Sequence, residues 1–375
     1  MYVYYFILAF TVMLALTFFV FFSYPKSWQK NRVLKIILLI QHSLGSLALG
    51  IVFICYKDVP YEWMKWIVSR WATIYQVTII MLAAFFFIRL IISKCYHLIR
   101  KNSGYEKKRV ITDKKLHSVV FIVLSYVISV IGFINIGQIH STTYDVTINK
   151  PSSVKELKIA FIADIHAGAG TWKYSYEDLT EALENADPDI LLIGGDLFDE
   201  TTSKQDAEYV KAVIRQISPQ YGIYFVFGNH DDYRDETTAN VLEELGVTIL
   251  RDETVTIDGA IQLIGRMDPV ADTLDIDELI KKEDIDMGKP VIVLQHRPIE
   301  YQKLADAGCD LVMSGHTHGF NIPQFAGNVT RFDMLQGIKK YGDMTAIVTS
   351  GVSAWGFHYK WPAKSEVVNI RLSFE

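Results

Sequence analysis

The sequence predicts a protein in two parts, a helical membrane region followed by an α/β domain. Half of the 375 residues are hydrophobic and 13% are aromatic, and the mean hydropathy is positive, which is too apolar for one ordinary soluble domain. The apolar excess lies in the first 140 residues. In the remainder, short apolar runs alternate with helical patterns, and five of these runs end in Asp, Asn or His.

Four apolar stretches in residues 1–140 are long enough to cross a bilayer, which takes roughly 20 helical residues. The first is not typical of a cleaved signal peptide, because residues 1–5 contain no basic residue and no small-x-small cleavage site precedes Lys26. We therefore expect a transmembrane region with four helices. They cover about 2–22, 33–56, 66–92 and 116–137.

The basic residues between these stretches predict the orientation of the chain. The link after the first stretch and its edge carry four lysines or arginines between 26 and 35, and the link before the fourth carries eight between 94 and 115. By the positive-inside rule both links are cytoplasmic. A multi-pass protein of the cell membrane is expected, with everything after residue 137 extracytoplasmic. The second basic link could also bind anionic membrane lipids, although topology alone accounts for it.

Charge and cysteine content exclude other classes. The net charge of −5 gives no basic field, so no nucleic-acid binding is indicated. Cys55, Cys95 and Cys309 lie in different regions without CxxC spacing, so neither a disulfide framework nor a thiolate metal site is expected. No obligate protein partner is evident.

After a linker at 141–155, residues 156–375 have the length of one globular domain. Within the linker, residues 142–148 alternate like an edge strand. Helices are expected at 175–185, 206–217, 236–245 and 300–307, and short strands at 247–250, 255–257, 261–265, 345–349 and 366–372. Two packed sheets flanked by helices would fit this order.

The five apolar runs that end in Asp, Asn or His carry side chains that can bind metals or transfer protons. Because buried strands of α/β folds present the residues at their ends to one edge of the sheet, we expect these side chains to meet there. They are Asp164, His166, Asp196, Asn229, His230, Asp231, His296, His316 and His318.

Aspartate and histidine suit Mn, Fe or Zn, and an asparagine oxygen is a weaker ligand. Two divalent ions roughly 3.5–4 Å apart, bridged by a carboxylate, can activate a water and stabilise a phosphoryl displacement. Each short motif alone is more often an ordinary polar turn. Their joint occurrence, each after an apolar strand, favours a site for two divalent metal ions.

The motifs Asp164-x-His166, Gly195-Asp196, Gly228-Asn229-His230-Asp231, His296 and Gly315-His316-x-His318 resemble the signature of the calcineurin-like metallophosphoesterase family, in its membrane-tethered bacterial type. The resemblance is strong over residues 157–320. It implies a four-layer α/β/β/α sandwich and a metal-dependent phosphoric ester hydrolase, either a phosphodiesterase or a phosphomonoesterase. The nucleophile implied is a metal-bound hydroxide.

The resemblance also implies a role for each residue. Asp164, His166 and His318 would bind one metal, and Asn229, His296 and His316 the other. Asp196 would bridge the two ions. His230 would stabilise the transition state or protonate the leaving group, and Asp231 would orient the His230 ring.

Other features leave alternatives open. Asp199 is interpreted as a helix cap. Residues 351–356 resemble the final turn of the membrane-tethered branch, but 357–362 lack the expected arginine and are interpreted as an aromatic lip facing the membrane. Five aromatic residues flank the site in sequence, namely Trp172, Tyr174, Trp355, Phe357 and Trp361. A lipid-linked or cell-envelope phosphoester is the preferred substrate. The alternative function is a non-catalytic, metal-dependent sensor or binding module for a phosphorylated ligand, which signals through the membrane helices.

Overall fold

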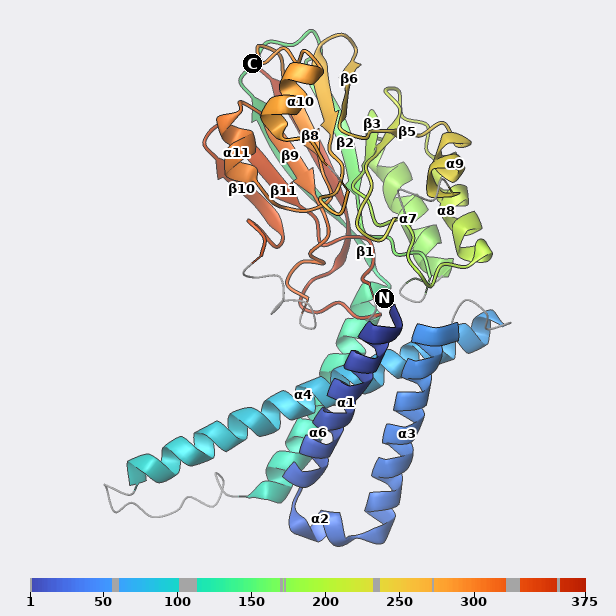
Figure 1. Ribbon diagram of the computed structural model, residues 1–375, viewed down its shortest axis with the longest axis vertical. Helices are drawn as coiled ribbons and strands as arrows, with labels where there is room; N and C mark the ends of the chain where they lie inside the picture. Colours follow the sequence, from blue (N-terminus) through green and yellow to red (C-terminus); the bar gives the residue numbers. More distant parts are fainter. Residues whose placement is uncertain are drawn as a thin grey trace. The chain divides into compact units, whose positions relative to one another are not determined.

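The computed structural model describes residues 2–55, 61–100, 113–168, 171, 173–231, 237–271, 273–321, 331–355 and 358–375 (Figure 1). The chain forms two compact units, Met1–Phe133 and Ile134–Glu375.

The first unit is helical, and each of the four predicted apolar stretches lies in a helix. The helices are α1 (Tyr2–Ser23), α2 (Lys26–Lys30), α3 (Arg32–Cys55), α4 (Glu62–Arg100) and α6 (Lys114–Ile136), the last of which ends inside the second unit. The sequence did not predict the short helix α2. Gln41 of α3 donates a hydrogen bond to the Tyr126 hydroxyl of α6, which is the interhelical packing expected of a polar residue among apolar helices.

Among the described residues, two helices are long and apolar enough to cross a membrane, Trp63–Tyr96 and Lys114–Ile136. A shorter apolar helix covers Phe10–Ser23. The predicted transmembrane region of four helices is therefore not confirmed, because only two of the described helices are long and apolar enough to cross a membrane.

The second unit contains two six-stranded sheets. The first has the order β1 (Ile139–Ile148), β12 (Ser365–Phe374), β2 (Glu156–Ile162), β3 (Ile190–Ile193), β4 (Ile223–Phe225) and β5 (Thr248–Ile249). The second has the order β10 (Gly337–Tyr341), β11 (Met344–Val348), β9 (Leu311–Ser314), β8 (Val291–Leu294), β7 (Ile261–Gly265) and β6 (Glu253–Ile257). Within their sheets β2, β3 and β4 run parallel, as do β7, β8 and β9.

The two sheets pack face to face, with helices on both outer faces (Figure 1). Alternate residues of β2 show this: Leu157, Ile159 and Phe161 join the core between the sheets, whereas Ala160 and Ile162 face the helices. The helices on the first sheet are α7 (Lys173–Ala186), α8 (Lys204–Gln216) and α9 (Thr237–Glu243), and those on the second are α10 (Ile276–Lys282) and α11 (Tyr301–Asp306). The predicted four-layer sandwich is thus confirmed.

The structure differs from the sequence prediction at several elements. Residues 141–155 contain most of β1, which pairs in parallel with β12 from Ile139 to Ile148. The predicted edge strand is confirmed, but it is an integral strand of the first sheet rather than part of a linker. Strand β10 and helix α10 were not predicted, although the Asp275 side chain caps α10 by accepting a hydrogen bond from the Asp277 backbone.

Candidate metal centre

All five predicted strand ends converge at one edge of the sandwich. The backbone there is tightly constrained, because Asp164, His166, Asp196, His316 and His318 all have positive φ angles between 44° and 71°. Non-glycine residues adopt this left-handed conformation at an energetic cost, and such residues cluster at functional sites where the surrounding structure imposes it.

Two glycines of the motifs are needed for close approach. A Cβ atom on Gly228 would lie 2.1 Å from Oδ1 of Asp196, and one on Gly315 would lie 2.5 Å from Oδ2 of Asp164. Any side chain at either position would collide with a predicted metal ligand. Because Gly315 has no side chain, the backbone N–H of His316 can donate a hydrogen bond to Asp164 Oδ2 at 2.9 Å, and this bond fixes the carboxylate.

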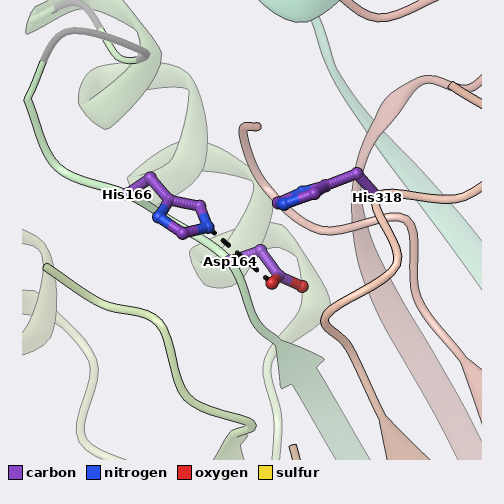
Figure 2. A group of neighbouring side chains, drawn as sticks. All are labelled: Asp164, His166 and His318. Atoms are coloured by element: carbon purple, nitrogen blue, oxygen red, sulfur yellow. Dashed lines mark ion pairs between the residues drawn. The ribbon is translucent and has the colours of Figure 1, made fainter. Parts of the chain in front are cut away.

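Asp164, His166 and His318 form the first group of potential ligands (Figure 2). All three side chains are buried, and their candidate ligand atoms lie within 4.8 Å of one another. Nε2 of His166 and Nδ1 of His318 are buried without a hydrogen-bond partner among the described residues. Buried polar atoms normally have partners, so these orphaned nitrogens fit a site whose missing partner is a metal ion.

Asp196, His296 and His316 form the second group. Nε2 of His296 lies 3.2 Å from Asp196 Oδ2, 3.1 Å from His316 Nδ1 and 3.2 Å from Asn229 Oδ1. Nδ1 of His296 bonds the Gly194 carbonyl at 2.8 Å, which leaves Nε2 to face the group. The structure therefore brings the Asn229 amide oxygen to the His296 nitrogen that faces this group.

Asp196 connects the two groups. Its Oδ2 atom lies 3.2 Å from His296 in the second group and 3.5 Å from His166 in the first. The other oxygen, Oδ1, accepts a hydrogen bond from the backbone N–H of His230 at 2.8 Å. One carboxylate thus faces both sets of ligands.

The buried charges of the centre keep the His316 and His318 rings neutral and favour a positive charge at His296. Burial and neighbouring imidazoles hold the pKa values of His316 and His318 well below the usual range, so both rings are neutral, as metal ligands must be. Burial opposes a charge on His296, but Asp196 and Asp164 outweigh it and raise its pKa to about 10. The carboxylates thus stabilise a cation at the position where His296 faces Asp196.

His230 lies beside the first group, with its ring 5.1 Å from that of His166. Its Nδ1 atom lies 3.5 Å from Oε2 of Glu200, and Oε1 of Glu200 accepts a hydrogen bond from the Trp355 indole at 3.0 Å. The Trp355 ring itself packs 5.0 Å from the His230 ring. Burial opposes a charge on His230, but Glu200 and Asp196 produce a net rise in its pKa.

Asp231 has contacts other than those expected. Its carboxylate accepts hydrogen bonds from the backbone N–H groups of Gly228, Asp196, Leu197 and Phe198, at 2.6–3.3 Å. These bonds clamp the loop that carries Asp196 onto the loop that carries Asn229. The partner recorded at the His230 ring is Glu200, so the interpretation of Asp231 as the residue that orients this ring is wrong.

The interpretation of Asp199 as a helix cap is also wrong. Ser203 caps α8, in a reciprocal capping box with Asp206. Asp199 Oδ2 instead lies 3.6 Å from Nδ1 of His166, and Oδ1 accepts from Thr201. A carboxylate behind a metal-binding histidine orients the ring and makes it a better ligand.

Lys360 occupies part of the segment where an arginine was expected. It is fully buried, and its ammonium donates hydrogen bonds to the carbonyls of Ser350 and Gly351. Burial lowers its pKa to about 7, although Asp164 and Glu366 act in the opposite direction. Of the five aromatic residues expected near the site, Trp355 contacts His230, whereas Trp172, Phe357 and the side chain of Tyr174 lie outside the described residues.

With this geometry established, comparison with known proteins shows the family. The family model for calcineurin-like phosphoesterases matches residues 157–320. A metallophosphoesterase of Aquifex aeolicus is 31% identical over 238 residues, which cover 61% of this chain and 90% of that relative. The chain belongs to the calcineurin-like phosphoesterase family. The resemblance found in the sequence is thereby confirmed.

Two further relatives of the calcineurin-like chain extend the comparison. A metallophosphoesterase of Helicobacter pylori is 34% identical over 227 residues, covering 58% of this chain and 60% of the relative. A Bos taurus protein named "Transmembrane protein with metallophosphoesterase domain" is 27% identical over 283 residues, covering 68% and 62%. The match thus spans about three fifths of these two relatives.

Proposed function

We propose that this protein is a membrane-anchored phosphoesterase with a dinuclear metal centre. The observation that carries the proposal is the position of Asp196, whose Oδ2 atom faces His166 of one ligand group and His296 of the other. A carboxylate between two sets of three ligands is the arrangement that two neighbouring divalent ions need.

In this proposal Asp164, His166 and His318 would hold one ion, and Asn229, His296 and His316 would hold the other. Asp196 would serve both. Mn, Fe or Zn suits this set of imidazole, carboxylate and amide ligands. When bound, the two ions supply Lewis acidity and an activated water for attack on phosphorus.

The remaining groups of the chain position the reaction. His230 holds a proton near the first ligand group and passes it to the leaving oxygen of the ester. Glu200 fixes the orientation of the His230 ring and favours its protonated form, because its carboxylate lies 3.5 Å from Nδ1. Asp231 holds the Asp196 and Asn229 loops together through four backbone hydrogen bonds.

Anchoring in the membrane is supported by the two apolar helices. Only 39% and 22% of their most apolar windows are buried inside the protein, so most of these side chains need another apolar environment. The Bos taurus relative is itself named a transmembrane protein. Together with the basic links, these features support a multi-pass topology with an extracytoplasmic catalytic domain and a lipid-linked or cell-envelope phosphoester as substrate.

The test is hydrolysis of chromogenic aryl phosphate mono- and diesters by the full-length protein in lipid nanodiscs. The protein is first freed of metal by a chelator and then supplied with Mn, Fe, Zn or Mg. We expect turnover that depends on metal and is lost in Asp196→Asn and strongly reduced in His230→Ala. The matched control is Asp258→Asn, in the turn between β6 and β7, which should retain full activity.

Metal binding without hydrolysis of any ester would refute the proposed enzyme. That outcome would favour the alternative, a metal-dependent binding module for a phosphorylated ligand.

A further inference from the structure

The two ligand groups of the metal centre differ in exposure. All three side chains of the first group are buried, whereas His316 of the second group is partly exposed. Asn229 and His230 are partly exposed as well. A substrate can therefore reach the centre from the side of the second group, and the side chains that border this group are in a position to bind the rest of the substrate.

Arg297 is one of these bordering side chains. It follows the ligand His296, just beyond the end of β8. Burial and the charge of His296 lower the pKa of His316, and the positive charge of Arg297 adds to this effect. The guanidinium of Arg297 thus acts on the ligand of the second group that is most accessible.

A second segment of the chain borders His316 beside Arg297. The backbone N–H of Asp333 donates a hydrogen bond to the Pro298 carbonyl at 3.0 Å, so the two segments run next to each other. The ring of Phe332 packs edge-on against the His316 ring, with the ring centroids 4.9 Å apart. Phe332 therefore provides an apolar side chain at the same border.

The Arg297 side chain is held in place but keeps donors for a ligand. Its Nε atom donates to Oδ2 of Asp268 at 2.8 Å, and the other oxygen of this buried carboxylate accepts from the Val270 N–H at 2.9 Å. The Arg297 side chain itself is 25% exposed, and among the described residues its two terminal nitrogens have no recorded hydrogen-bond acceptor. A buried carboxylate thus orients a guanidinium whose terminal nitrogens remain available.

The neighbouring Arg266 has a different environment. Its side chain is 6% exposed, and its terminal nitrogens donate to the side chains of Gln295 and Glu300 and to the Leu274 carbonyl. Arg266 therefore stabilises the fold, and its terminal nitrogens have acceptors within the protein. The terminal nitrogens of Arg297 need an acceptor from outside the described chain or from water.

The reacting phosphate itself belongs elsewhere in the centre. It must reach His230, whose ring packs 5.1 Å from that of His166 and 5.0 Å from that of Trp355. The recorded side-chain partner of Arg297 is Asp268, which contacts none of these three rings. Arg297 is therefore placed to meet another part of the substrate.

We propose that Arg297 binds a second phosphate group of the substrate, one that is not cleaved, beside the second ligand group. The terminal nitrogens of a guanidinium form a planar pair that matches two oxygens of a phosphate. Phe332 forms an apolar wall of this subsite, and a less polar surrounding strengthens the hydrogen bond between the two charged groups. The inference rests on the proposed function and names its substrate class as phosphoesters that carry a second phosphate close to the reacting one.

The test measures binding without turnover and uses phosphonates, whose P–C bond the enzyme does not hydrolyse. Full-length protein in phosphatidylcholine nanodiscs is loaded with Mn²⁺, dialysed free of excess metal and titrated calorimetrically with propylphosphonate, propylenediphosphonate or phosphonobutyrate. We expect the diphosphonate to bind at least about tenfold more tightly than propylphosphonate, which is the gain expected of a charge-assisted hydrogen bond.

Variants of Arg297 show whether this residue produces the gain. Arg297→Gln should remove it and change the Kd of propylphosphonate by less than about twofold. Arg297→Lys keeps the charge but not the planar pair of donors, so it should retain part of the gain. The matched control is Arg371→Gln, because Arg371 also faces a carboxylate, that of Asp145, but pairs with Lys158 near the start of β2. This variant should keep the full gain.

Three outcomes would overturn the proposal. A gain that survives in Arg297→Gln would show that another group, or chelation of the metal, binds the second phosphonate. An equal loss for propylphosphonate and the diphosphonate would show that the pair of Arg297 and Asp268 only stabilises the fold. Phosphonobutyrate that binds as tightly as the diphosphonate would contradict the assignment to a phosphate.

Failure of the proposed function would be distinguishable from these outcomes. Propylphosphonate that binds equally well with and without Mn²⁺, or the absence of ester hydrolysis, would contradict the metal centre and its activity. The ratio of the two Kd values in the Arg297 variants tests the subsite alone.

Discussion

Replacement of Glu200 by glutamine should slow the hydrolysis of esters with poor leaving groups far more than that of esters with good ones. Glu200 lies 3.5 Å from Nδ1 of His230 and is itself held by the Trp355 indole at 3.0 Å. If His230 donates a proton to the leaving oxygen, Glu200 acts only where the leaving group needs that proton. The nitrophenolate ion leaves without it, whereas an alkoxide does not.

The size of the effect follows from the contacts. A hydrogen bond to a charged group contributes about 1.5–3 kcal/mol, which corresponds to roughly 10- to 100-fold in rate. We therefore expect Glu200→Gln to lower kcat/KM by about that factor for an alkyl or phenyl ester and by less than about threefold for a nitrophenyl ester. Trp355→Phe keeps a ring against His230 but removes the indole donor, so it should produce a smaller loss in the same direction.

The assay is steady-state hydrolysis of a series of aryl and alkyl phosphoesters by metal-loaded, full-length protein. Glu208→Gln is the matched control, because Glu208 lies on α8, is 56% exposed and pairs with Lys211 of the same helix. It should leave the whole series unchanged. The same fractional loss for every leaving group in Glu200→Gln would refute the reasoning, since a purely structural defect does not distinguish between leaving groups.

Three further predictions concern metal binding and stability. The pKa of metal-free His296 is about 10, so below that pH a metal ion that binds to His296 must displace its proton. Metal affinity should therefore rise with pH by up to about tenfold per pH unit. Calorimetry in two buffers should detect the released proton, and the absence of proton release would contradict the charge assigned to His296. Asp199→Asn should weaken Mn²⁺ binding by about 10- to 100-fold by loosening the His166 ring, and an unchanged Kd would show that this carboxylate does not orient the ligand. Gly351→Ala should lower the Tm by roughly 5–15 °C, because the residue has a φ of +81° and its new Cβ would lie 2.7 Å from Cβ of Asp164; a Tm within one or two degrees of the original would mean that the turn can shift freely.

The side chains that the sequence analysis expected to meet do lie together, because the signal that located them is local. Most of strand β2 is an apolar run, from Ile159 to Ile162, and the first acidic residue after this run is Asp164. The same logic located Asp196, Asn229, His296 and His316. The metal roles assigned to these residues remain predictions.

The supporting residues could not be predicted because their partners are distant in the sequence. Glu200 meets Trp355 across 155 positions, and Lys360 is fully buried although lysine side chains are rarely so. The error at Asp231 has a different cause. The family resemblance assigned Asp231 to the His230 ring, but the carboxylate accepts hydrogen bonds from the backbone amides of Asp196, Leu197 and Phe198.

The place of β12 in the first sheet has a consequence for biosynthesis. Residues 365–374 follow every other strand in the chain, yet they lie between β1 and β2. Thr147 on β1 contacts Ser373 on β12 across 226 positions, so β1 leaves the ribosome long before β12, the strand it pairs with in the described part of the chain, has been made. During that interval the helices of the first unit can already fold, while β1, which follows them, stays unpaired. The sheet that carries Asp164 and Asp196 is therefore completed last, and loss of ten residues near the end of the chain would remove a central strand.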